Sequence, residues 1–395
     1  MGASSSSNAL MDKTVVVIGG SYGGNAAAIH LKGKCKLIVI DAKEAMFLSV
    51  SSPRAVVEPE FTNKILVPLT DVHGESFRRG KVVQIDPPEK TVSLEDGTTI
   101  SYDYLVIATG SSNPFPGKIT NDTSIQECHA LYKDASEKVK AAQRITVIGG
   151  GASGVELAGE IATDFPQKDV TLIHSRDTLL EPAVRPKLRT MVEEQLLDLK
   201  VNLVKGEKVL DLSDIPTDLS GGFREVKTDK GTIVPSDLVF ICIGMSVNKT
   251  VYANSLASSM DERGALRVNS YLQVEGFEEI FAVGDCSTAD QQKMANKARL
   301  HGESVASNIP LHADGKAMKP YKTPGVLYAV SVGRNRGGIQ IGSHIIMGSW
   351  FVKRVKGKDM FTTRLWSDNR LTVPASKDMF TTRLWSDNRL TVPAS

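Results

Sequence analysis

The sequence predicts an α/β protein with two Rossmann-like dinucleotide-binding domains, followed by a smaller C-terminal α+β domain. Short apolar, β-branched runs at residues 15–18 and 145–148 each lead into a glycine-rich turn and then into a stretch of small, helix-tolerant residues. That strand–turn–helix context is the one in which such a turn holds a dinucleotide pyrophosphate. A length of 395 residues exceeds one ordinary domain, so two or three are expected.

The first unit fills residues 14–41. Glycine supplies the tight turn and the close backbone approach at a helix N-terminus. The residues expected to hold this dinucleotide are Gly19, Gly20, Ser21, Tyr22, Gly23 and Gly24. Ser21 stands where the middle glycine is usual, and its hydroxyl either donates to the pyrophosphate or is merely tolerated in the turn. Asp41 ends the next strand about 20 residues beyond the glycines, the spacing at which a carboxylate accepts the adenosine ribose hydroxyls.

The second unit has its turn at Gly149, Gly151 and Gly154. Its second strand ends without an acid, at His174, Ser175 and Arg176. A carboxylate there would repel the 2′-phosphate of NADPH, whereas arginine accommodates it, so we expect NADPH to be accepted alongside NADH. The alternative is an Arg176 that faces solvent without touching the cofactor. Two such units in one chain suggest a bound flavin and a nicotinamide that reduces it.

Composition excludes several classes. With 47 basic and 45 acidic residues the net charge is +2, which does not favour nucleic acid as the main partner. The cysteines lie too far apart for a zinc cluster or a redox dithiol, so no metal site is expected, and buried thiols are the simplest interpretation; they are Cys35, Cys128, Cys242 and Cys286. No apolar run reaches the length of a membrane span, and no secretory signal precedes the first strand.

The remaining elements follow in order. Residues 81–110 alternate strands with turns, including a hairpin signal at 95–97. Helices are expected at about 127–142, 186–199 and 292–308, with β-rich segments at 201–244 and from about 319 onward. We expect an FAD domain at 13–113 and 246–318, an inserted NAD(P)H domain at 114–245 and a C-terminal domain at 319–376.

Both ends of the chain carry further signals. Residues 1–12 read as a flexible tail in which Gly2 fits the N-myristoylation pattern, with serine at position 6; a plain Ser-rich tail is the alternative. One acyl chain binds a membrane only marginally, so a second contact is needed. The best candidate is the aromatic and basic run at 350–358, unless it is a strand with solvated lysines. Residues 358–376 recur identically at 377–395, and we expect one copy to be surplus to the fold.

The two glycine turns, Ala108-Thr109-Gly110 and Gly284-Asp285 stand in the order found in a known family. The chain resembles the flavoproteins with two dinucleotide-binding domains, in which an NAD(P)H domain interrupts the FAD domain and an interface domain ends the chain. Within that family it is similar to the apoptosis-inducing-factor branch over nearly its whole length. The finer matches, besides the Met-Gly start, are PFPGK at 114–118, GVE at 154–156, VTLIHS at 170–175, GALRVN at 264–269, KMA at 293–295 and GRN at 333–335.

The resemblance implies roles for single residues. Ala108, Thr109, Gly110 and Gly284 would contact FAD, and Asp285 would bind its ribityl hydroxyls, a role compatible with an N-cap for the next helix. Glu156 would lie close to the contact between nicotinamide and flavin, where it orients the nicotinamide or relays protons; a carboxylate favoured by the helix dipole is the alternative.

Two lysines and several aromatic residues complete the set of candidates. Lys118 and Lys293 are candidates to steady the charge of the reduced flavin or a phosphate, unless they are solvated surface lysines. Quinone reduction also needs a channel with apolar walls. For each candidate wall residue, the alternative is that it belongs to the ordinary hydrophobic core. These candidates are Tyr328, Trp350, Phe351, Met360 and Phe361.

For the whole chain the resemblance implies a myristoylated, FAD-dependent NAD(P)H:quinone oxidoreductase, whose quinol traps lipid radicals and suppresses lipid peroxidation and ferroptosis. It would act on the cytoplasmic face of the plasma membrane, lipid droplets or mitochondrial outer membrane, with a cytosolic pool. Three alternatives stay open: a reductase of a protein electron carrier, a DNA-binding death effector, and a redox sensor that forms a homodimer through its C-terminal domain. A disulfide reductase is excluded, because residues 25–35 hold only Cys35.

Overall fold

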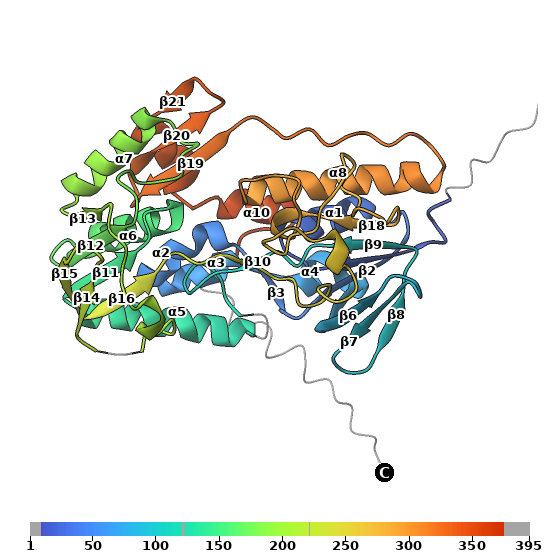
Figure 1. Cartoon of the computed structure of the whole chain (residues 1–395), viewed down its shortest axis with the longest axis horizontal. Helices are drawn as coiled ribbons and strands as arrows, with labels where there is room; N and C mark the ends of the chain where they lie inside the picture. Colours follow the sequence, from blue (N-terminus) through green and yellow to red (C-terminus); the bar gives the residue numbers. More distant parts are fainter. Residues whose placement is uncertain (1–8, 121–122, 221, 375–395) are drawn as a thin grey trace, which may run out of the picture.

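The computed structural model describes residues 9–120, 123–220 and 222–374. Two helix-covered parallel sheets lie next to each other, and a small antiparallel sheet packs beside the second (Figure 1). Gly2 and the second copy of the repeat, at 377–395, lie outside the described residues. The predicted α/β class with two Rossmann-like units and a C-terminal α+β part is confirmed.

The first parallel sheet has the strand order β18-β9-β1-β2-β5. Its strands are β1 (Thr14–Ile18), β2 (Lys36–Asp41), β5 (Phe77–Arg79), β9 (Tyr104–Ile107) and β18 (Ile280–Ala282). β18 pairs in parallel with β9 although the whole second unit separates them in sequence. The first domain is therefore discontinuous, as predicted, while its exact limits stay a prediction.

Two helices cover one face of this sheet, α1 (Tyr22–Leu31) and α8 (Ala295–Ala313). They pack very closely, because a Cβ added at Gly302 would stand 2.1 Å from the carbonyl oxygen of Gly23. α8 begins later than predicted and its N-cap is Met294, so Asp285 does not cap it and that expectation was wrong. On the other face lies an antiparallel sheet of β6 (Val82–Asp86), β7 (Thr91–Leu94) and β8 (Thr99–Ser101), with the predicted hairpin at 95–97.

An excursion between β2 and β5 reaches toward the second domain. It contains β3 (Ala45–Phe47), α2 (Ser52–Val57), α3 (Thr62–Ile65), β4 (Leu66–Pro68) and α4 (Leu69–His73). Arg54 on α2 is buried and donates to both carboxylate oxygens of Glu160, at 2.6 and 2.8 Å, and to the carbonyl oxygen of Gly357 at 3.0 Å. Such a buried, paired charge is costly to break, so it ties three parts of the chain together.

The second parallel sheet has the order β13-β12-β11-β16. Its strands are β11 (Arg144–Ile148), β12 (Asp169–His174), β13 (Asn202–Lys205) and β16 (Leu238–Ile241); its helices are α5 (Ile125–Ala141), α6 (Ala152–Asp164) and α7 (Pro186–Asp198). α5 begins at residue 125 because Ser124 and Glu127 form a reciprocal capping box. Two antiparallel pairs complete this part of the chain, β14 (Arg224–Lys227) with β15 (Ile233–Ser236), and β10 (Ser111–Ser112) with β17 (Ser246–Val247).

The C-terminal part contains β19 (Leu327–Val332), β20 (Arg336–Ile341), β21 (Ile345–Met347), α9 (Ser349–Val352), the π-helix η7 (Lys353–Gly357) and α10 (Thr362–Asp368). The β-rich expectation from residue 319 onward was right only for these three strands. Residues 349–357 are helical, with Val352 and Lys356 buried four residues apart on one face, so the strand alternative was wrong.

The first copy of the repeat packs into the molecule. The Trp366 Nε1–H donates to the backbone carbonyl oxygen of Lys64 at 2.8 Å, and the side-chain Oδ1 of Asn369 accepts a hydrogen bond from the Asn25 side-chain amide at 2.7 Å. This copy therefore occupies the site in the fold that one of the two was expected to take.

Candidate functional site

The first glycine turn is dictated by close backbone contacts. Gly19 has a φ of +101°, and a Cβ there would stand 2.3 Å from the carbonyl oxygen of Ala108. A Cβ on Gly24 would stand 1.8 Å from the carbonyl oxygen of Gly19. Asp41, at the end of β2, accepts the Gly20 N–H at 2.7 Å through one carboxylate oxygen. Only glycine permits this turn. The turn brings the end of β2 against the start of α1.

The second turn repeats this geometry. Gly149 has a φ of +115°, and a Cβ on Gly154 would stand 1.8 Å from its carbonyl oxygen. Here His174, at the end of β12, accepts the Gly150 N–H at 3.1 Å through Nδ1. Burial and the neighbouring Arg176 lower the pKa of His174, so the imidazole stays neutral.

The neutral imidazole decides how Arg176 is held. A neutral ring has one acceptor nitrogen, and the Gly150 N–H occupies it. The Arg176 Nε lies 3.3 Å from the other ring nitrogen, Nε2, which carries the proton when Nδ1 accepts from Gly150. Among the described residues, the carbonyl oxygen of Leu180 accepts from the Arg176 guanidinium at 2.8 Å. Its guanidinium is therefore only loosely held at the end of β12, next to the exposed Ser175.

One cavity of about 910 Å³ joins the two units and reaches the C-terminal sheet. Its lining includes most of the predicted site: Gly19, Ser21, Tyr22, Gly23, Asp41, Ala108, Thr109, Gly110, Lys118, Gly151, Glu156, Gly284, Asp285 and Lys293. The other predicted residues shape the turns or lie at the end of β12 without lining it: Gly20, Gly24, Gly149, Gly154, His174, Ser175 and Arg176. Ligand sites of 300 to 1,000 Å³ are typical, so this volume suits an extended dinucleotide.

Asp285 faces the cavity from a short turn after β18. Its carboxylate accepts the Ser111 hydroxyl at 2.5 Å and lies 3.4 Å from the Lys118 ammonium. Lys118 also donates to the carbonyl oxygen of Ser111 at 2.6 Å. Burial lowers the pKa of Lys118, partly offset by Asp285. The expectation of a solvated surface lysine is therefore wrong at this position, because the cavity wall encloses the ammonium.

Lys293 is likewise held inside the cavity wall. Its ammonium donates to the carbonyl oxygens of Ser287 and Asp290. Burial lowers the pKa of this lysine too. The surface-lysine alternative fails here as well, and its carbonyl partners fix the direction of the side chain.

Glu156 lies on α6 and forms a buried ion pair with Lys356 of η7. The two side chains are 4% and 5% exposed, and both residues line the cavity. Glu156 also accepts the Ser331 N–H at 3.0 Å, from β19. The pair therefore joins the second unit to the C-terminal sheet. Lys356 was expected only as one surface cation of the run 350–358, and its burial corrects that; its spacing of four from Val352 was the available signal.

Tyr328 on β19 is 4% exposed and lines the same cavity. Among the described residues its hydroxyl has no hydrogen-bond partner. Burial raises the pKa of this phenol well above its usual value, as do Glu181 and Glu156 nearby. A buried donor without a partner is costly, so the hydroxyl points to a ligand that accepts from it.

The other proposed apolar walls do not line this cavity. Trp350 is 67% exposed, while Met360 is fully buried in the core. Phe351 and Phe361 are partly buried and lie away from the lining. Of the five candidates, Tyr328 alone belongs to the lining.

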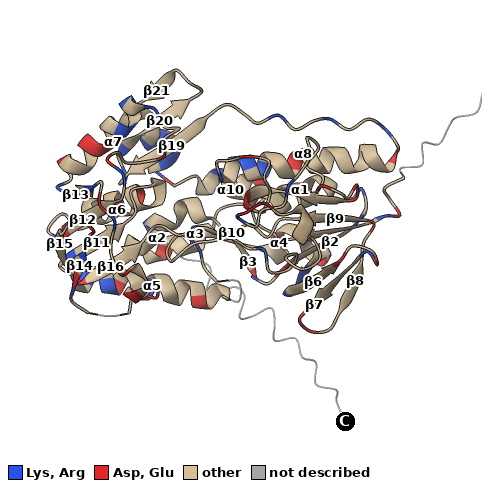
Figure 2. Cartoon of the chain, viewed as in Figure 1, with Lys and Arg blue, Asp and Glu red and all other residues tan. Residues whose placement is uncertain are grey.

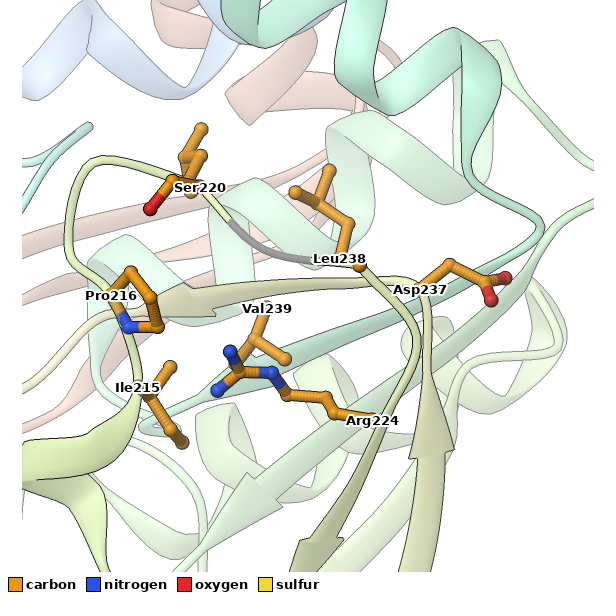
Figure 3. A pocket seen from close by; sticks show the side chains of 9 residues that line it. Ile215, Pro216, Ser220, Arg224, Asp237, Leu238 and Val239 are labelled. Atoms are coloured by element: carbon orange, nitrogen blue, oxygen red, sulfur yellow. The ribbon is translucent and has the colours of Figure 1, made fainter.

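Smaller features add little. A hollow of about 10 Å³ lies beside β14 and β16, and Arg224 reaches into it between Ile215 and Val239 (Figure 3). It has room for about one water molecule.

Within residues 9–120, 123–220 and 222–374, no three His, Cys, Asp or Glu side chains are placed to hold a metal ion. The same residues contain no helix long and apolar enough to cross a membrane. The four cysteines are free thiols, two of them only partly buried.

Comparison with known proteins supports the resemblance. The family described as pyridine nucleotide-disulphide oxidoreductase matches residues 13–302. Ferroptosis suppressor protein 1 of Taeniopygia guttata is 38% identical over 91% of this chain and 97% of its own. Apoptosis-inducing factor homolog B of Dictyostelium discoideum is 32% identical over 89% of this chain and 95% of its own.

A solved structure shows the same fold. The sulfide:quinone oxidoreductase of Aquifex aeolicus has a TM-score of 0.75 with 20% identity, covering 92% of this chain and 93% of its own. These matches confirm the predicted resemblance.

Proposed function

The chain belongs to the pyridine nucleotide-disulphide oxidoreductase family and is an FAD-dependent NAD(P)H oxidoreductase, and we propose that its electron acceptor is a ubiquinone-type quinone. The observation that carries this proposal is the cavity that runs from both glycine turns to Tyr328 and the Lys356–Glu156 pair. Its relatives named Ferroptosis suppressor protein 1 support a role for the quinol product in suppressing ferroptosis.

The first unit fits FAD. The α1 N-terminus and the Gly19 turn offer backbone N–H groups to a pyrophosphate. Asp41 lines the cavity with a carboxylate that retains acceptor capacity for ribose hydroxyls. Asp285 faces the cavity from the turn after β18, where its carboxylate can accept from ribityl hydroxyls. When bound, FAD supplies the hydride and electron chemistry.

The second unit fits NAD(P)H. The α6 N-terminus at Gly151 lines the cavity and receives the pyrophosphate. Arg176 is loosely held at the end of β12, in place to reach a 2′-phosphate. Glu156, on the first turns of α6, orients the nicotinamide end and at the same time holds the Lys356 ammonium.

Reduction of the quinone takes up two electrons and two protons. NAD(P)H supplies the electron pair and one proton as hydride, and the second proton comes from solvent, so NAD(P)H, H⁺ and quinone give NAD(P)⁺ and quinol. The chain's own contribution is to donate hydrogen bonds where the quinone oxygens gain charge. The Tyr328 hydroxyl has no hydrogen-bond partner among the described residues, and the Lys356 side chain, paired with Glu156, lines the same cavity.

An anaerobic absorbance titration tests the proposal. We expect NADH to bleach the flavin bands and a short-chain ubiquinone to restore them. The Tyr328→Phe variant removes only the hydroxyl, so the quinone KM should rise about tenfold while bleaching by NADH is unchanged. Bleaching without recovery would point to another acceptor, such as a protein carrier, or to a sensing role.

The location is part of the same proposal. Gly2, which lies outside the described residues, would carry the myristoyl group at the cytoplasmic face of a membrane. A Gly2→Ala variant should lose most of its membrane association and keep its activity in solution. Unchanged partitioning of this variant in cell fractionation would remove the anchor from the proposal.

A further inference from the structure

The segment from Gly315 to Lys358 has an unusual charge pattern. It contains no Asp or Glu and nine Lys or Arg, although the whole chain has a net charge of only +2. Figure 2 shows Lys and Arg, and no acid, along the strap that connects α8 to β19. The remainder of the chain is therefore net negative, and positive charge is concentrated in this C-terminal part.

Several of these cations have acidic partners. Lys316 pairs with Asp314, Arg334 with Asp164 and Glu58, Arg336 with Asp198, and Lys356 with Glu156. The exposed cations that form no ion pair with the described residues are Lys319, Lys322, Lys353, Arg354 and Lys358. These five offer charge to a partner outside the chain.

The same part exposes a row of large apolar side chains. Leu327, Ile341 and Ile345 lie directly opposite one another in the registers of β19, β20 and β21, so they share one face of the sheet. Their exposed fractions are 45%, 39% and 54%. Trp350 and Val355 are also exposed, on helices α9 and η7 that pack against this sheet.

Aromatic and cationic side chains are interleaved at this surface. The Arg354 guanidinium lies over the Trp350 ring, 4.4 Å from its centroid. Lys353 and Lys358 flank the same helical run and are exposed. Tryptophan beside lysine and arginine is the composition of a lipid headgroup boundary, where rings sit among headgroups and cations meet anionic lipid.

We propose that Leu327, Ile341, Ile345, Trp350 and Val355, with Lys353, Arg354 and Lys358, form a docking surface for an anionic lipid bilayer. We call these residues the C-terminal surface. Exposed apolar area gains by insertion between headgroups, and the cations gain by neutralising them. The absence of acids from 315–358 removes the repulsion that an anionic membrane would otherwise meet.

At two places, adjacent residues connect the C-terminal surface with the cavity. Leu327 precedes Tyr328, and Val355 precedes Lys356; in each pair the first residue is exposed and the second lines the cavity. On β19 this follows from the alternation of side chains along a strand. The docked sheet would thus lie between bilayer and cavity, where a lipid-soluble acceptor enters. This link rests on the proposed function, whereas the docking surface itself does not.

Vesicle sedimentation tests the proposal with the full chain, made in a host without N-myristoyltransferase so that Gly2 stays unmodified. We expect binding to vesicles of phosphatidylcholine with phosphatidylserine, and much less to phosphatidylcholine alone. Each cation near an anionic surface contributes about fivefold to binding, so Lys353→Glu with Lys358→Glu should lower it about 25-fold or more. Ile345→Ser with Trp350→Ser should lower binding to both kinds of vesicle.

Helix α5 supplies matched controls on the far side of the second sheet from this surface (Figure 1). Leu131 is 44% exposed, and Lys133 and Lys140 are exposed. Leu131→Ser, and Lys133→Glu with Lys140→Glu, should leave vesicle binding within about twofold, since they change the same residue types outside the C-terminal surface.

Three results would overturn the docking surface. The first is vesicle binding by the C-terminal variants equal to that of the parent. The second is a parent that is dimeric while the Ile345 and Trp350 variant is monomeric and neither binds vesicles, since a second copy would then cover the face. The third is vesicle binding that appears only after residues 377–395 are removed. Reduction of a soluble short-chain quinone is measured in parallel. A parent protein that binds vesicles but does not reduce this quinone would contradict the proposed function and leave the docking surface intact.

Discussion

The two glycine turns are nearly the same in backbone and different in the group that supports them. In both, the fourth-placed glycine of the turn, Gly24 or Gly154, has a Cβ position 1.8 Å from a carbonyl oxygen of the same turn. In both, a side chain at the end of the second strand accepts the N–H of the second glycine. That side chain is Asp41 in the first unit and His174 in the second.

The difference shows which part of the motif is structural and which part selects the ligand. The hydrogen bond to the second glycine is kept whether the acceptor is a carboxylate or a neutral imidazole, so it belongs to the turn. The charge is not kept. A carboxylate accepts from ribose hydroxyls and repels a 2′-phosphate. A neutral His174 beside Arg176 does not repel that phosphate. One backbone design thus serves two dinucleotides.

The largest effect is expected from filling the turns themselves. Gly24→Ala should yield protein without flavin colour, because the methyl group collides with the backbone of the first turn. Gly154→Ala should keep FAD and slow its reduction by NADH about a hundredfold or more. Absorbance of the purified proteins and stopped-flow reduction measure the two outcomes. If both variants lost FAD equally, the division of the cofactors between the turns would be wrong.

The units also differ in how they bury histidine. This difference predicts that the free energy of unfolding falls by about 2 kcal/mol on acidification. His73 on α4 is 1% exposed, and neither ring nitrogen has a partner among the described residues. Burial lowers its pKa from 6.5 to about 4. The unfolded chain therefore takes up the proton first, so the stabilisation is present above pH 6.5 and is lost as pH falls toward 4.

Urea unfolding measures this contribution. Between pH 7 and pH 5, His73 should account for a loss of about 2 kcal/mol in the free energy of unfolding, and His73→Leu should remove that part of the loss. The ring of His174 differs from that of His73, because it accepts a hydrogen bond from the Gly150 N–H. An equal loss in parent and His73→Leu would show that acid acts elsewhere in the protein.

A charge change at His174 should exchange the character of the two sites. His174→Asp keeps an acceptor for the Gly150 N–H and places a carboxylate where Asp41 stands in the first unit. The ratio of kcat/KM for NADPH to that for NADH should fall about tenfold or more, since like charges would meet at the 2′-phosphate. His174→Asn, which accepts without charge, is the matched control and should keep the ratio. An unchanged ratio in His174→Asp would place the 2′-phosphate away from β12.

The sequence predicted the parts that depend on local pattern. Glycine turns after apolar strands have few structural solutions, so β1, α1, β11 and α6 were placed closely, and the return of β18 followed from the position of Asp285. It did not predict the contacts made by distant segments. The Lys356–Glu156 pair depends on η7 folding against α6, and the spacing of four between Val352 and Lys356 signals a buried lysine only when residues 349–357 are known to be helical. The same packing left Tyr328 in the cavity and turned Trp350 out to solvent.

The smallest effect is expected where the two turns differ by a hydroxyl. Ser21 is the N-cap of α1 and Gly151 is the N-cap of α6, and neither makes a side-chain capping bond. Exchanging serine for glycine at such a position costs only a few tenths of a kcal/mol. Ser21→Gly should therefore change the dissociation constant of FAD by less than about twofold, measured by flavin fluorescence on dilution. Tenfold weaker binding would mean instead that the Ser21 hydroxyl donates to the pyrophosphate, and the first turn would then hold its ligand by a side chain that the second turn lacks.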